Sequence, residues 1–143
     1  SKSHGLAGIR IGYAVAPKDF VRIYDKMRPP FNVSTLAQAG ACAALRDEAF
    51  LKATIEHTRQ ALVRLTHIFT QAGAKTYPSF ANFLWADFGR DTMPLYEHLL
   101  NEGVIIRTGH MFGKPTCVRV SVGTNEELDL LEEAMRKVLP LFP

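Results

Sequence analysis

The sequence opens with SKSHGLAGIRIGY over residues 1–13, a stretch that holds one lysine, one arginine and three glycines. Glycine permits positive φ angles and lets the backbone approach a ligand closely. A lysine amine becomes a nucleophile when burial or nearby positive charge disfavours its ammonium form. The planar guanidinium of an arginine suits a phosphate group. Lys2 and Arg10 therefore predict a site for an aldehyde cofactor with a phosphate tail; a surface lysine and arginine around a glycine turn are the alternative.

The same stretch resembles, without gaps, the S-K-x-x-G-L-x-G-x-R-x-G signature of fold-type I aminotransferases. In that family the lysine carries pyridoxal 5'-phosphate (PLP) covalently, and the arginine binds the phosphate of this cofactor. The resemblance implies that Lys2 is the catalytic and cofactor-binding residue. It also implies that Arg10 holds the cofactor phosphate.

A second set of motifs begins a hundred residues later with GVIIR over 103–107, followed by FGKP over 112–115 and CVRVSVGTNEE over 117–127. The interior of an apolar strand is a costly place for a charge without a partner, and Arg119 lies between two valines. A carboxylate that binds both ends of the guanidinium is one natural partner, and a structural salt bridge is the alternative. The motifs are similar to the carboxyl-terminal pattern of the aminotransferase family. The resemblance implies that Arg119 binds the α-carboxylate of an amino-acid substrate.

Arg107 ends an apolar segment, and an exposed arginine at a strand end is one reading of it. In the histidinol-phosphate aminotransferases, which the chain resembles most, an arginine of this region contacts the substrate phosphate. The segment RPPFNVS over residues 28–34 is similar to the same group. The resemblance implies amino transfer between histidinol phosphate and 2-oxoglutarate in histidine biosynthesis. The alternatives are another fold-type I aminotransferase, a threonine-phosphate decarboxylase, or a module without catalysis that folds or self-associates.

Hydrophobic spacing predicts a mixture of a few strands and about five helices, which is an α/β fold class. We expect strands over residues 8–16, 75–77, 81–88, 104–107 and 117–122. We expect helices over residues 18–28, from Ser34 or Thr35 to a break near 46–48, and over 51–72, 93–101 and 125–138. Thr124 and Glu127 are spaced as a capping box at the start of the last helix.

The prolines near residue 30 indicate a boundary between two structural parts. The resemblance implies that residues 1–34 end the large PLP-binding domain. Residues 35–143 then form the linking helix and the small carboxyl-terminal domain, which has an α+β character. Several cofactor-contacting residues of the family precede the lysine. We therefore expect a carboxyl-terminal fragment of a homodimeric enzyme that does not catalyse transamination by itself.

The charged residues are 17 basic and 14 acidic side chains, spread along the chain without a Lys/Arg run. This spread argues against a nucleic-acid or membrane-surface partner. The family resemblance implies small-molecule substrates. No apolar run approaches the ~20 residues that span a bilayer. Cys42 and Cys117 lie in unrelated contexts, which favours reduced thiols in a cytoplasmic protein. The five histidines show no metal-ligand spacing.

Overall fold

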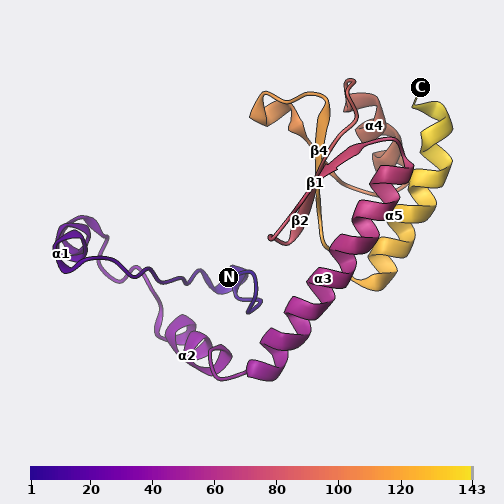
Figure 1. Cartoon of the computed structure of the whole chain (residues 1–143). Helices are drawn as coiled ribbons and strands as arrows, with labels where there is room; N and C mark the ends of the chain where they lie inside the picture. The colour runs from indigo at the N-terminus through magenta and orange to yellow at the C-terminus, as the bar shows by residue number, and fades with distance from the viewer. Residues whose placement is uncertain (143) are drawn as a thin grey trace. The chain divides into compact units, whose positions relative to one another are not determined.

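The computed structural model describes residues 1–142 (Figure 1). Contacts within the chain divide it into two compact units, Ser1–Ile55 and Glu56–Pro143. The first unit contains the lysine loop, and the second contains both strand arginines, Arg107 and Arg119. The boundary expected near residue 34 concerns the domains of the whole enzyme and stays a prediction.

The first unit holds short helical elements joined by irregular segments. They are η1 (Ala7–Ile9), α1 (Lys18–Met27), α2 (Thr35–Ala44) and the first turns of α3 (Glu48–Gln71). The Oγ of Ser34 accepts a hydrogen bond from the backbone N–H of Ala37 at 3.1 Å, which confirms the expected helix cap. Ala37 is also the one buried apolar side chain of this unit among the described residues.

The strand expected over residues 8–16 is wrong. Arg10 adopts φ 55° and ψ 56°, a left-handed conformation that interrupts an extended chain. Beyond it, Tyr13 is 84% exposed and Val15 is 92% exposed, and no other described strand pairs with this segment. Alternating apolar residues form a stable strand only where a neighbouring strand takes up their backbone hydrogen bonds.

The second unit is built on a four-stranded antiparallel sheet with the strand order β1-β2-β4-β3. Its strands are β1 (Lys75–Tyr77), β2 (Phe83–Asp87), β3 (Arg107–Thr108) and β4 (Cys117–Ser121), and its further helices are α4 (Met93–Asn101), η2 (Gly109–Phe112), α5 (Asn125–Val138) and η3 (Leu139–Leu141). The α/β class is thereby confirmed. The strand expected over 104–107 is reduced to β3, because Val104–Ile106 diverge from the ladder.

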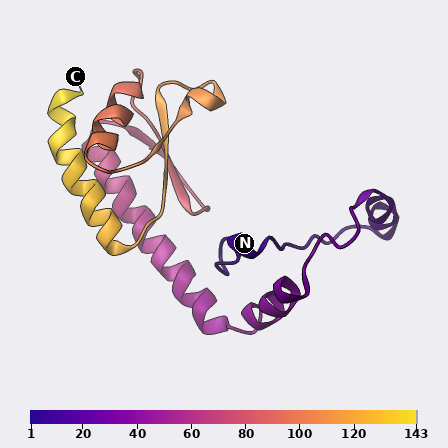
Figure 2. The ribbon, with the colours of Figure 1, turned by 180° about the vertical axis from the view of Figure 1, so that it is seen from behind.

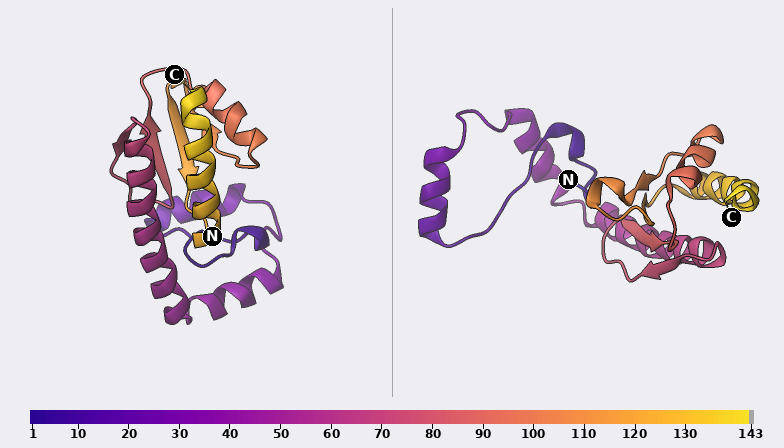
Figure 3. Two further views of the ribbon diagram at one scale, coloured as in Figure 1. Left: turned by 90° about the vertical axis from the view of Figure 1, so that its right-hand side faces the viewer. Right: turned by 90° about the horizontal axis from the view of Figure 1, so that it is seen from above.

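The helices α3, α4 and α5 cover one face of this sheet (Figures 2 and 3). Leu84, Ala86, Val118 and Val120 point to that face and are buried against the helices. Strand residues between them point to the other face, which none of α3, α4 and α5 covers. Alternation along β2 and β4 therefore separates an apolar core from a face that is free to carry charge.

The end of β4 is held tightly where α5 begins. Glu127 N–H donates to Thr124 Oγ1 at 3.3 Å and Thr124 N–H donates to Glu127 Oε2 at 2.7 Å, which confirms the capping box. A Cβ atom placed on Gly123 would lie 2.6 Å from Glu127 Oε2, so a glycine is required there. His57 of α3 bonds the Gly123 carbonyl at 2.8 Å, which fastens this turn to the helix layer.

Leu65 lies on α3 with 0% exposure in the core of the second unit, whereas Val63 of the same helix is 69% exposed. We expect Leu65→Ala to lower the free energy of unfolding by about 2–5 kcal/mol, because it leaves a cavity in a packed core. Val63→Ala should change it by less than about 0.5 kcal/mol. Urea denaturation followed by circular dichroism measures both. Equal effects of the two substitutions would contradict the described packing of α3.

Candidate functional site

The lysine loop in the first unit is closed on itself by short-range hydrogen bonds. Gly5 N–H donates to the Lys2 carbonyl at 3.1 Å, with Gly5 at φ 65°. The hydroxyl of Ser1 donates to the carbonyl of Ile11 at 3.1 Å. Because Ser1 precedes Lys2 and Ile11 follows Arg10, this bond brings the backbones of the two predicted cofactor residues to the base of one loop.

Both cationic side chains of this loop are exposed, and neither forms an ion pair with a carboxylate of residues 1–142. The Arg10 guanidinium donates to the Ala7 carbonyl within its own turn. Its left-handed backbone is uncommon for a residue other than glycine and is often found at functional sites. An amine and a guanidinium at the base of one glycine-containing loop fit the aldehyde and the phosphate of PLP.

The two arginines of the second unit lie directly opposite each other on neighbouring strands. Arg107 of β3 and Arg119 of β4 are Cα partners in the ladder, so their side chains point to the same face. This is the face that the helices leave uncovered. Like charges in this arrangement repel, and neither guanidinium is within 4.0 Å of a carboxylate in the described part of the chain. The pair is therefore a candidate anion site, since neither arginine has a carboxylate partner among residues 1–142.

Each guanidinium has a neutral neighbour instead. The Arg119 Cζ lies 5.3 Å from the centroid of the Phe83 ring. Its Nε is buried, and no acceptor among residues 1–142 reaches it. The Arg107 Nη1 donates to the Sδ of Met111 at 3.2 Å. Such partners hold a guanidinium in place but leave its charge uncompensated.

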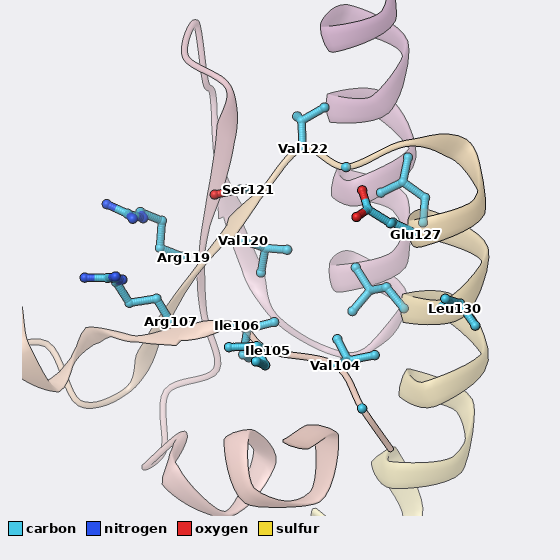
Figure 4. Close-up of a pocket in the computed structure, with 14 residues that line it drawn as sticks. Val104, Ile105, Ile106, Arg107, Arg119, Val120, Ser121, Val122, Glu127 and Leu130 are labelled. Carbon is cyan, nitrogen blue, oxygen red and sulfur yellow. The ribbon is translucent and has the colours of Figure 1, made fainter. Parts of the chain in front are cut away.

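The arginine pair forms the rim of a cleft of about 490 Å³ between residues 103–107 and the end of β4 (Figure 4). Apolar side chains of Val104, Ile106 and Val120 line it, and Glu127 of α5 closes the far end. In Figure 4 the two guanidinium groups extend side by side away from α5 and Glu127. The positive charge is thus presented outside the cleft, on the sheet face opposite to α5 and its carboxylate.

Two carboxylates at the ends of the neighbouring elements are stabilised as anions by local hydrogen bonds. A backbone amide hydrogen bond at the start of α5 and the Thr124 side chain lower the pKa of Glu126. The backbone N–H of Gly89 and the hydroxyl of Thr116 lower the pKa of Asp87. Both acids are occupied by these local bonds and do not neutralise the arginine pair.

The sequence predicted four site residues, and the structure groups them in twos, Lys2 with Arg10 in the first unit and Arg107 with Arg119 in the second. Sequence reasoning missed Phe83 and Met111. Their only signal was position, since Phe83 begins β2 and Met111 follows Arg107 by four residues. His110, which lies near the site in sequence, is 3.2 Å from the Asp91 carboxylate through its Nε2.

No group of three or more His, Cys, Asp or Glu side chains is arranged to hold a metal ion within residues 1–142. None of the described helices combines the length and the apolar character that crossing a membrane requires. Cys42 is exposed and Cys117 is buried, and both are free thiols, as expected.

Comparison with known proteins identifies the family to which the chain is similar. The profile of the aminotransferase class I and II family matches residues 1–135. Histidinol-phosphate aminotransferase of Geobacillus thermodenitrificans is 43% identical over 139 residues, which are 97% of this chain and 38% of that protein. Histidinol-phosphate aminotransferase 2 of Methylococcus capsulatus is 44% identical over the same shares. The chain therefore spans only 38% of the length of these relatives.

A solved structure shows the same fold over the whole chain. Histidinol-phosphate aminotransferase of Sinorhizobium meliloti, in complex with PLP, superposes with a TM-score of 0.92 at 31% identity, covering 100% of this chain and 40% of that one. The match includes the lysine loop and the strand that carries Arg119. From its sequence motifs, its fold and these relatives, the chain belongs to the aminotransferase class I and II family.

Proposed function

We propose that the chain is the carboxyl-terminal part of a PLP-dependent histidinol-phosphate transaminase of histidine biosynthesis. The observation that carries the proposal is the pair of arginines facing each other on β3 and β4 without a carboxylate partner among residues 1–142. A site that stores two uncompensated positive charges suits substrates that bring a carboxylate or a phosphate. Histidinol phosphate and 2-oxoglutarate, the substrates that the resemblance implies, are both anions.

The two arginines then take different anions. Arg119 binds the α-carboxylate of glutamate or 2-oxoglutarate, because its fork of N–H groups matches two carboxylate oxygens. Arg107 binds the phosphate of histidinol phosphate, and its greater exposure suits the larger group. The strand ladder fixes the spacing of the two anchors, so each substrate is oriented by the sheet.

The first unit carries the residues that we propose for binding the cofactor. Lys2 attaches PLP through its Nζ, and Arg10 holds the cofactor phosphate at the base of the same loop. PLP, when bound, acts as an electron sink for the substrate carbon that carries the amino group. With the cofactor bound, Lys2 Nζ would serve as the general base that moves a proton at that carbon.

The exposed apolar surface of the first unit supports a larger parent enzyme. Tyr13, Val15 and Phe31 are each at least 84% exposed, and Ala37 alone is buried there among the described residues. Side chains of this kind are normally covered in a folded protein. We propose that further parts of the enzyme and the mate of a cytoplasmic homodimer cover them. The 143-residue chain alone is then not a competent transaminase.

In the full-length enzyme, Lys2→Ala should abolish covalent attachment of PLP, because no other side chain of the loop offers an amine. Borohydride reduction followed by intact-mass measurement checks this. The unmodified enzyme should gain a PLP-sized mass on the peptide that contains Lys2. Lys18→Ala is the control, since this exposed helix lysine lies outside the loop, and it should leave the labelling unchanged. A labelled Lys2→Ala enzyme would refute the assignment.

Because the two arginines are proposed to bind different anions, replacing Arg107 should weaken the binding of histidinol phosphate more than that of glutamate. Arg107→Gln should raise the KM for histidinol phosphate by about 10- to 100-fold, the worth of a hydrogen bond to a charged group, with a smaller effect on glutamate. Steady-state kinetics of the full-length enzyme with each substrate measures the ratio. Lys114→Gln removes an equal charge from the exposed loop beyond η2 and should leave both values unchanged.

Equal losses with both substrates on Arg107→Gln would contradict a phosphate-binding role. An unmodified enzyme that accepts other amino donors but not histidinol phosphate would instead indicate a different fold-type I aminotransferase.

A further inference from the structure

The two arginines are held by neutral side chains, although carboxylates are the usual partners of a guanidinium in a protein. Phe83 lies next to Arg119, and Met111 lies next to Arg107. Half-buried Arg64 of the same unit pairs with Asp129 and Glu132 at 2.7 Å. Arg90 instead lies over the Phe142 ring, 4.2 Å from its centroid, without an ion pair to any of the described residues. The two site arginines differ from both because they lie opposite each other on paired strands and neither has an acid partner there.

We infer that Phe83 and Met111 are positioning residues that fix the two substrate-binding arginines while leaving their charges available, Phe83 for the carboxylate anchor and Met111 for the phosphate anchor. This inference rests on the proposed function. An acid in either place would occupy the N–H groups that the substrate needs and would repel the incoming anion. An aromatic ring or a thioether also orients the guanidinium, but its interaction with the guanidinium is much weaker than that of a carboxylate.

The sheet register explains how Phe83 reaches Arg119. Phe83 is the Cα partner of Ser121, and Trp85 is the partner of Arg119, so Phe83 is the diagonal neighbour of the arginine on the same face. Arg119 extends over this ring with its Nε buried. The buried Nε limits rotation of the side chain, and the ring fixes its direction, so the terminal N–H groups are presented outward.

The Met111 side chain is 64% exposed, and its position is set by contacts that η2 makes on both sides of it. A Cβ atom on Gly109 would lie 2.0 Å from the Lys114 carbonyl, so the turn closes against its own backbone. The Phe112 ring meets Trp85 of β2 edge to face, with centroids 5.7 Å apart. The thioether between these two contacts is therefore brought to Arg107, where it accepts the Nη1–H bond.

The test uses the full-length enzyme and its two amino donors. Phe83→Leu should raise the KM for glutamate by about two- to fivefold at unchanged kcat, because the guanidinium loses its aromatic neighbour. Phe83→Tyr keeps the ring and should restore the original KM. Met111→Leu should raise the KM for histidinol phosphate by about two- to threefold, the low end for a neutral hydrogen bond.

Matched controls come from the same unit. Tyr77→Leu removes an aromatic side chain from the same face of the sheet, and Met93→Leu makes the same thioether exchange at the start of α4. Neither residue contacts an arginine of the site, so both variants should keep the original KM values. Thermal unfolding of every variant verifies that each is folded when its kinetics are measured.

The inference is overturned if Phe83→Leu and Met111→Leu match their controls, or if they lower kcat at unchanged KM. It is also overturned if Phe83→Tyr behaves as Phe83→Leu does. If the proposed function itself is wrong, the experiment gives another result: the unmodified enzyme does not turn over histidinol phosphate at all. The glutamate measurements on Phe83 remain decisive in that case.

Discussion

Two positive charges face each other across β3 and β4, and the second unit is arranged to keep them there. Arg107 and Arg119 repel, so the ladder between them must be held by something else. That support comes from the opposite face, where Leu84, Val118 and Val120 are buried under three helices. The apolar layer thus stabilises a strand pair whose exposed face is unfavourable by itself, which is the usual relation between a core and a functional site.

The two units contribute stability unequally. The core of the chain lies in the second unit, where side chains such as Phe69 and Leu95 are 0% exposed. The lysine loop is ordered mainly by local bonds, for example Ser1 to Ile11 and Gly5 to Lys2. Local bonds of this kind are weak supports, and the loop is packed only lightly within its unit, where the Phe50 ring lies beside Gly5. The arginine pair, in contrast, is fixed by its own unit.

Helices were predicted well from the sequence, and strands less well, for a physical reason. The period of apolar residues in α3 and the capping box of α5 are local signals, and both are confirmed. A strand depends on a partner that sequence periodicity does not show. The segment 8–16 has the right alternation and no described partner, and β3 keeps only the two residues that β4 can reach.

The same distinction applies to the site. Motifs predicted the charged residues because charge in an apolar strand or beside glycines is locally unusual. Phe83 and Met111 look like ordinary core residues in the sequence, and only the register of β2 with β4 and the turn of η2 bring them to the arginines. Because these partners are neutral, the sequence around them shows no charge pattern that would indicate their role. A site that keeps its arginines unneutralised for substrate is therefore one whose supporting residues must be found in the folded structure.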